Sequence, residues 1–195
     1  MAIDPRPMRM SVEEYFLYDR DSQLRHEYLD GYAVAMSDGT MAHNRLTLNM
    51  AVLLMEPQKC PCRVYASDVR VRVAEKRYYY PDVVVSCNVD DHRDNNDMLR
   101  SPHLIVEVLS NSTEARDRGE KLTAYQQCEC VQEYMLVNTR IRRVEAYCRQ
   151  ADGEWDSRIY ENGQEVVCES LDIQIPIASL YAGVRIPAEL PAALE

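Results

Sequence analysis

Two short apolar runs, each containing one acidic residue, constrain the fold of this chain more than any other feature. Residues 82–86 begin with Asp82 and continue with three valines, and residues 104–109 are apolar except for Glu107. Continuous apolar runs of this length are typical of strands that are covered on both faces of a sheet. The sequence therefore predicts two central strands, each carrying a carboxylate where acids are usually depleted.

An acid in such a strand needs a compensating partner. An unpaired buried carboxylate costs several kcal/mol, and two carboxylates about 4 Å apart repel by roughly 4 kcal/mol at an effective dielectric of about 20. If the two strands are neighbours, a divalent cation such as Mg²⁺, which prefers oxygen ligands, would compensate Asp82 and Glu107 together. The alternative is that each acid lies at a strand end and meets an arginine or water, and the spacing leaves both interpretations open.

A helix is predicted over residues 112–128, directly after the second strand. Asp117, Lys121 and Tyr125 recur every four residues and therefore share one helix face. If that face turns toward the sheet, the lysine could reach the two carboxylates. The alternative is an exposed ion pair between Asp117 and Lys121, worth a few tenths of a kcal/mol.

The rest of the chain predicts a mixed α+β domain. Asp-Gly pairs at 30–31 and 152–153 indicate hairpins. Helices are predicted over about 11–18, 42–55 and 176–181, and strands at 26–29, 32–36, 69–73, 133–138, 143–147 and 155–160. We expect a central mixed sheet flanked by helices, with hairpin additions toward the N- and C-terminal ends. We also expect residues 1–10 to be a flexible segment, 11–182 a single domain and 183–195 a tail.

Seven segments, in this order and spacing, resemble one family. They are residues 11–15 (SVEEY), 25–31 (RHEYLDG), 43–44 (HN), 80–85 (YPDVVV), 104–113 (LIVEVLSNST), 117–121 (DRGEK) and 133–137 (EYMLV). The chain resembles the PD-(D/E)XK nuclease superfamily and, more closely, a large bacterial family of uncharacterised restriction-endonuclease-like proteins. The superfamily's lysine would stand two residues after the glutamate, where this chain has Leu109. In the family that it resembles, a lysine of the following helix takes that place, and Lys121 matches it.

The resemblance implies a restriction-endonuclease-like core and a metal-dependent endonuclease that hydrolyses phosphodiester bonds in DNA. Asp82 and Glu107 would hold Mg²⁺ or Mn²⁺, with the Val108 carbonyl as a third oxygen ligand. Lys121 would orient the attacking water or stabilise developing negative charge. A nuclease that cuts two strands is expected to be a homodimer.

Further side chains are candidates for accessory roles. Glu27 could complete the metal site, or be an exposed glutamate at a strand edge. His43 could contact phosphate or accept a proton, or be a capping or core histidine. Arg63, Arg70 and Arg72 could contact phosphates, or form a solvated strand face.

The net charge of −10 disfavours casual binding of polyanions. Together with Leu109 at the lysine position, this charge keeps open an alternative function. The chain would then be a nuclease-fold module of weak or absent catalytic activity that binds nucleic acid or a protein partner.

The cysteines and the N-terminal sequence bear on the compartment. No apolar h-region and no apolar run near the roughly 20 residues of a membrane helix are present, so we expect a cytoplasmic protein with reduced thiols and no membrane contact. Cys60 and Cys62, like Cys128 and Cys130, are one residue apart, whereas zinc sites usually place two or more residues between paired cysteines. A structural zinc site on these four residues is the third hypothesis.

Overall fold

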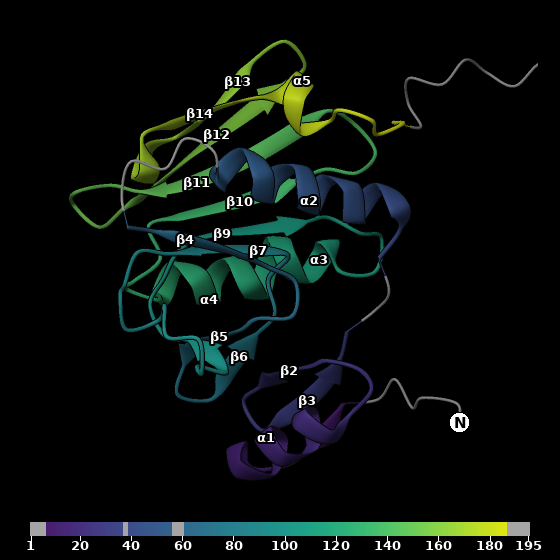
Figure 1. The fold of residues 1–195 in the computed structure, drawn as a ribbon, viewed down its shortest axis with the longest axis vertical. Coiled ribbons are helices and arrows are strands. Elements are labelled where there is room, and N and C mark those ends of the chain that lie inside the picture. The colour runs from purple at the N-terminus through teal and green to yellow at the C-terminus, as the bar shows by residue number, and fades with distance from the viewer. Residues whose placement is uncertain (1–6, 37–38, 56–60, 187–195) are drawn as a thin grey trace, which may run out of the picture.

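The computed structural model describes residues 7–36, 39–55 and 61–186 (Figure 1). At its centre is a six-stranded sheet with the strand order β12-β11-β10-β9-β7-β4. These strands are β4 (Arg63–Ala66), β7 (Val83–Ser86), β9 (Pro102–Val108), β10 (Glu133–Val137), β11 (Arg143–Arg149) and β12 (Trp155–Glu161). Only the pair β9 and β10 in this sheet is parallel, so the sheet is mixed, as predicted.

One face of the central sheet is covered by the long helix α2 (Met41–Met55). The helix α5 (Ile177–Leu180) and the hairpin of β13 (Glu165–Cys168) and β14 (Ile173–Pro176), which are joined by the short turn η2 (Glu169–Leu171), complete this layer (Figure 1). Leu46, Met50 and Leu54 of α2 are fully buried and belong to one apolar cluster with alternate residues of β7 and β9. The other residues of those strands, Val84 and Ile105, belong to a second cluster on the opposite face, because successive strand side chains point to opposite sides.

The opposite face is covered by one interrupted helix. It consists of α3 (Glu114–Arg116), a π-helical turn η1 (Asp117–Lys121) and α4 (Leu122–Gln127), which follow β9 and return across the sheet. Tyr125 of α4 is fully buried in the second apolar cluster. The face on which Val84 and Ile105 lie is therefore the face that carries this helix.

A second sheet packs below this helix in Figure 1 and carries the N-terminal part of the chain. Its order is β1-β3-β2-β6-β5-β8, with strands β1 (Met8–Arg9), β2 (His26–Leu29), β3 (Tyr32–Ala35), β5 (Arg70–Ala74), β6 (Arg77–Tyr79) and β8 (Met98–Leu99). Helix α1 (Val12–Asp21) packs on it through Tyr15, which stacks on Tyr28. The hairpin predicted at 26–36 is confirmed, with Asp30 and Gly31 at positive φ in its turn.

The ends of the domain differ from the expected boundaries. Met8 and Arg9 pair with β3, so the segment expected to be flexible through residue 10 contains a strand. Val184 and Ile186 are buried in the main core, so the residues from 183 onward do not begin as a loose tail. In the described part of the chain, no helix is long and apolar enough to cross a membrane.

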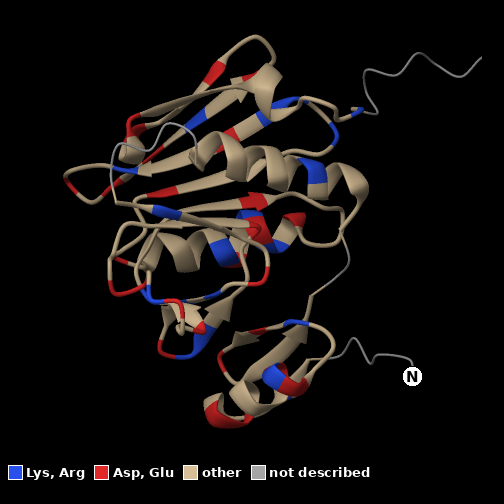
Figure 2. Ribbon diagram, in the orientation of Figure 1, with Lys and Arg blue, Asp and Glu red and all other residues tan. Residues whose placement is uncertain are grey.

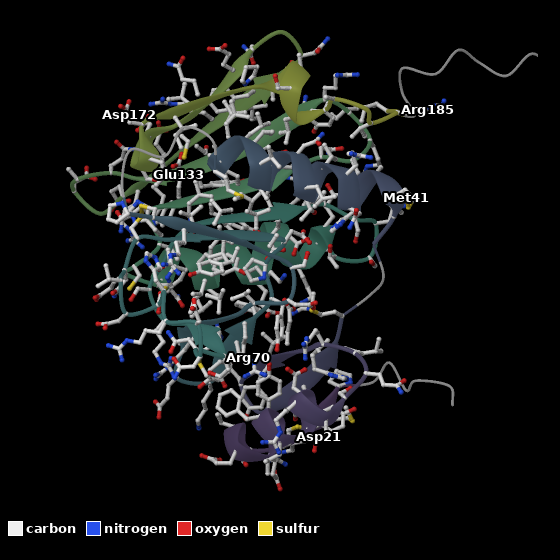
Figure 3. All side chains as sticks on the ribbon, in the orientation of Figure 1. Asp21, Met41, Arg70, Glu133, Asp172 and Arg185 are labelled. Carbon is white, nitrogen blue, oxygen red and sulfur yellow. A yellow bond between two sulfur atoms is a disulfide. The ribbon has the colours of Figure 1, made fainter. Side chains whose placement is uncertain are left out.

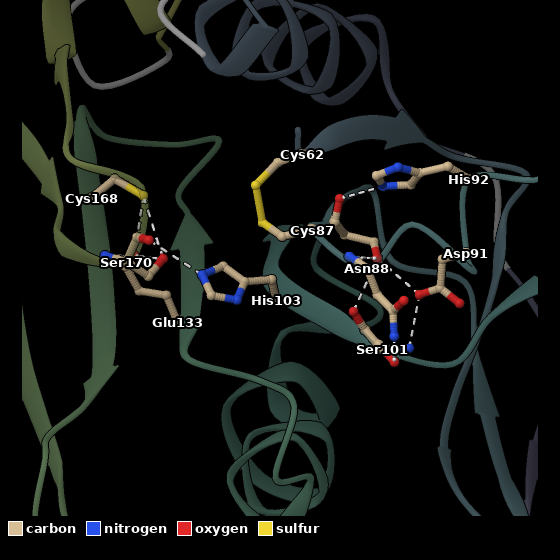
Figure 4. Close-up of a disulfide and its surroundings, with 11 residues drawn as sticks. Cys62, Cys87, Asn88, Asp91, His92, Ser101, His103, Glu133, Cys168 and Ser170 are labelled. Atoms are coloured by element: carbon tan, nitrogen blue, oxygen red, sulfur yellow. Dashed lines mark hydrogen bonds between the residues drawn. A yellow bond between two sulfur atoms is a disulfide. The ribbon is translucent and has the colours of Figure 1, made fainter. Parts of the chain in front are cut away.

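A disulfide joins Cys62 and Cys87 (Figure 4). Cys62 precedes β4 and Cys87 follows β7, and the antiparallel register that places Arg63 opposite Ser86 brings the two cysteines face to face. The expectation of reduced thiols is therefore wrong for this pair. The four-cysteine zinc hypothesis loses Cys62, and Cys60 lies outside the described residues.

A buried ion pair fastens α1 to the second sheet. Asp19 is 0% exposed and accepts hydrogen bonds from the Arg70 guanidinium at 2.7 Å, the Tyr80 hydroxyl at 2.5 Å and the His26 backbone N–H at 2.7 Å. Arg70 is itself buried and also donates to Tyr80. The nearby acid Asp21 is exposed and pairs with Arg20 at the surface.

The Asp19 network predicts a large difference between two chemically identical substitutions. Asp19→Ala should lower the free energy of unfolding by about 3–5 kcal/mol, because it leaves a buried guanidinium without its counter-charge. Asp21→Ala should change it by less than about 0.5 kcal/mol. Urea denaturation followed by circular dichroism measures both, and equal midpoints for the two variants would contradict this account of the network.

Candidate active site

Asp82 and Glu107 lie side by side on the face of the central sheet that carries the interrupted helix. Strands β7 and β9 are antiparallel neighbours with Val83 opposite Val106, so the residue before β7 lies next to Glu107. The Asp82 Oδ2 atom accepts a hydrogen bond from the Val108 N–H at 2.7 Å. The structure thus brings together the two acids of the apolar runs.

Lys121 is the centre of this cluster. Its Nζ atom lies 2.9 Å from Glu107 Oε1, 2.9 Å from Glu27 Oε1 and 3.4 Å from Asp117 Oδ1. The Tyr125 hydroxyl donates a further hydrogen bond to Glu107 Oε1 at 3.0 Å. Because Asp117 and Lys121 are 1% and 5% exposed, the alternative of a solvent-exposed ion pair on this helix is wrong.

The position of this lysine follows from the local helix geometry. Asp117 and Lys121 open and close the π-helical turn η1, and Tyr125 follows one turn later in α4. All three are buried, so the shared face predicted from their spacing is the face that packs on the sheet. Single π-helical turns inside α-helices are frequent at functional sites.

Glu27 reaches the cluster from the second sheet. It lies on β2, is 2% exposed, and receives a hydrogen bond from Arg116 at 2.7 Å on its other carboxylate oxygen. The Tyr80 backbone N–H also points to it, at 3.4 Å. Its alternative role as an exposed edge glutamate is therefore wrong, and the cluster joins the two sheets.

His43 approaches from the opposite side, on α2. Its Nε2 atom is 3.2 Å from Asp82 Oδ2. Burial would lower the pKa of His43, but the hydrogen bond to Asp82 and the negative charge of Asp82 outweigh it and, with a hydrogen bond to the Val108 backbone, raise the pKa. Gly39 leaves room for the ring, since a Cβ there would lie 3.0 Å from His43 Nδ1.

The cluster holds more negative than positive charge. Glu27, Asp82, Glu107 and Asp117 face two permanent cations, Lys121 and Arg116. Figure 2 shows acidic and basic residues meeting at this end of β9 and α3.

Burial and the neighbouring charges together shift the pKa values in this cluster. Burial raises the pKa of Glu107 well above its usual value. Lys121 opposes that shift, and the neighbouring acids reinforce it. Burial likewise raises the pKa of Asp117, although Lys121 lowers it. Burial lowers the pKa of Lys121, but the negative charges of Glu107 and the other acids outweigh burial and hold this pKa well above its usual value.

These groups line an open cleft of about 320 Å³. The turn of residues 110–113, which carries three hydroxyl side chains, forms part of its rim, and Arg116 and Tyr80 also reach it. The cleft therefore presents carboxylates, one ammonium group and an imidazole to anything that enters.

The donor chemistry of this cleft fits a hard divalent cation. All four acids offer oxygen atoms, which Mg²⁺ prefers. Asp117 Oδ1 is buried and, among the described residues, has no hydrogen-bond partner, although Lys121 Nζ lies 3.4 Å from it. The surplus negative charge would be offset by a cation. Within the described residues, however, no three His, Cys, Asp or Glu side chains are already arranged as a ligand set, so the side chains must adjust to hold an ion.

The arginines chosen from the sequence lie elsewhere. Arg70 is buried against Asp19, so its predicted phosphate contact is wrong. Arg63 lines a different hollow, beside the acids Asp91 and Asp94. Arg72 is exposed on β5 and is not among the residues that line the cleft. The contacts of Arg63 and Arg72 with phosphate stay predictions.

Sequence reasoning missed one cation of the site. Arg116 bridges to Glu27 across 89 positions of the chain, and no local pattern signals such a contact. Asp117 was recognised only as the partner of Lys121 and proves to line the cleft itself.

The chain is similar to several known proteins. It is 30% identical to an uncharacterized protein of Synechocystis sp. over 178 residues, which cover 90% of this chain and 93% of the relative. A second uncharacterized protein of Synechocystis sp. is 32% identical over 149 residues, covering 75% of this chain and 84% of the relative.

A solved structure shares the fold. It is described as a putative nuclease belonging to DUF820 from Anabaena variabilis, and it superposes with a TM-score of 0.71 at 16% identity, over 89% of this chain and 98% of that one. A model of the Uma2 family, described as putative restriction endonuclease, matches residues 12–178. The chain therefore belongs to the Uma2 family, with a fold consistent with the restriction-endonuclease-like superfamily.

Proposed function

We propose that this protein is a divalent-metal-dependent endonuclease that hydrolyses phosphodiester bonds in DNA. The observation that carries the proposal is the convergence of Asp82, Glu107 and Lys121 in one open cleft. These are the residues that match the nuclease motif, and they come from the position before β7, from β9 and from the turn η1, which the fold brings together. The family and the fold of the solved relative support a nuclease.

Asp82 and Glu107 would hold Mg²⁺ or Mn²⁺, with the Val108 carbonyl as the neighbouring oxygen donor. A bound ion of this kind polarises a phosphate and lowers the pKa of a water molecule. Lys121 stays protonated because its pKa is raised by the surrounding acids, so it acts as a cation and not as a base. Its role is to orient the attacking water and to stabilise negative charge that develops on the phosphate.

His43 is the titratable group best placed for proton transfer. The hydrogen bond and the charge of Asp82 raise the pKa of His43 against the effect of burial, which favours the protonated ring. The ring lies at the rim where Asp82 meets the cleft. A protonated imidazole there can donate a hydrogen bond to a phosphate oxygen. Glu27 positions Lys121 and Arg116, because its carboxylate forms an ion pair with each of them.

A binding module without catalysis is the second candidate function. It is favoured by Leu109 at the superfamily's lysine position and by the three acids that already pair with Lys121. This candidate predicts binding of nucleic acid or a protein partner without turnover. The expected homodimer and the cytoplasmic location remain predictions under either candidate.

One test of the proposed nuclease concerns the metal ligands. Asp82→Asn should abolish cleavage and remove the heat of Mn²⁺ binding in titration calorimetry, because one of the two strand carboxylates loses its charge. Asp94→Asn, which makes the same change at an exposed residue, should leave both intact. Cleavage is measured on single-stranded, duplex and branched DNA and on RNA, with each metal. If folded wild-type protein cut none of them, the binding module would replace the nuclease.

Another test distinguishes the role of Lys121 in the reaction from metal binding by the carboxylates. Lys121→Met should lower the cleavage rate by about 10²–10³-fold, the usual effect of removing one group that stabilises developing charge. It should keep the heat of Mn²⁺ binding, because the carboxylates remain. Lys76→Met, at an exposed lysine, is the control. Thermal unfolding checks that both variants fold, and a wild-type rate in folded Lys121→Met would exclude the lysine from the mechanism.

A further inference from the structure

A second hollow adjoins the active-site cleft. It has a volume of about 370 Å³ and shares three lining residues with the cleft, namely His43, Ser110 and Ser112. The two spaces therefore meet across the turn that follows β9. A chain-like molecule that occupies the cleft would extend directly into the second hollow.

The two spaces differ in charge. The cleft is lined by four carboxylates, whereas the described residues that line the second hollow include Arg140 and Arg185 and no acid. Because the whole protein carries a net charge of −10, an anionic polymer is repelled at long range and must be attracted at local cationic positions. The second hollow is such a position beside the proposed reaction centre.

Arg185 is the cation of this hollow whose charge no described acid neutralises. Arg140 donates a hydrogen bond to Asn111 Oδ1 at 3.0 Å and forms an ion pair with Glu114, which neutralises much of its charge. Arg185 is exposed, and it forms no ion pair with any acid of the described residues. Figure 3 places Arg185 on the same side of the molecule as Met41, the first residue of α2, which also carries His43.

Polar donors complete the hollow. Asn111 accepts from Arg140 through its carbonyl oxygen, which leaves its amide N–H groups for a ligand. Thr40 and the hydroxyl-bearing turn of residues 110–112 also line the space. A guanidinium group with amide and hydroxyl donors is a set that suits a phosphate.

We propose that this hollow binds a backbone phosphate that flanks the scissile phosphate in the same nucleic-acid strand, with Arg185 as its main counter-charge. This inference rests on the proposed nuclease function, since it takes the carboxylate cleft as the place of the scissile group. In this proposal Arg185 binds the substrate through a backbone phosphate and does not contact a nucleobase.

The test is the salt dependence of binding. A fluorescent oligonucleotide, single-stranded or duplex, is titrated with protein in EDTA between about 50 and 200 mM salt. The binding constant K falls as salt rises, so the slope of log K against log salt is negative. Each lost phosphate contact reduces the magnitude of this slope by about 0.7 for single strands and about 0.9 for duplex. Arg185→Ala should show this loss, and Arg185→Lys should keep the wild-type slope.

The matched control is Arg100→Ala. Arg100 is exposed on the segment that follows β8, and it is not among the residues that line either space, so its slope should equal that of wild type. Equal slopes for Arg185→Ala and Arg100→Ala would overturn the inference. So would a wild-type protein that binds neither oligonucleotide.

A parallel cleavage assay with Mg²⁺ and Mn²⁺ separates this inference from the proposed function. Cleavage by wild type with an unchanged slope in Arg185→Ala would overturn the phosphate hollow alone. A reduced slope in Arg185→Ala without cleavage by wild type would support the hollow and overturn the hydrolysis.

Discussion

The site depends on the burial of one ammonium group among three carboxylates. Lys121 contacts Glu107 of the central sheet, Glu27 of the second sheet and Asp117 of its own helix, and it is almost fully buried. Taking these charges out of water is costly, and the cost is recovered only where each charge has partners in good geometry. This requirement fixes the position of the interrupted helix against both sheets, so the same contacts that shape the cleft hold the layers of the fold in register.

Much of the fold could be predicted because its signals are local. Ser11 and Glu14 form a capping box at the start of α1, and the turn of Asp30 and Gly31 is a short-range hairpin signal. The small elements escaped prediction for a physical reason. β4 and the hairpin of β13 and β14 are short strands whose pairing depends on distant partners and whose sequence carries little periodicity.

The site shows the same division. Asp82 and Glu107 could be identified because an acid in an apolar run is an anomaly within a single element. The spacing of Lys121 also allowed an exposed ion pair, and its role followed from the resemblance to the nuclease family. The burial of Arg70 could not be predicted, because its strand alternates as a half-exposed strand would and its partner Asp19 lies 51 positions away. Arg116 and Arg185 could not be found from the sequence, because their relation to the cleft arises from the packing of remote segments.

The place of Glu27 on the second sheet has a consequence for how small this protein can become. A fragment that started at α2 would retain the central sheet, both strand carboxylates and the lysine, yet it would lack the acid that shares the lysine with Glu107. The N-terminal hairpin is thus an integral part of the carboxylate-lined cleft.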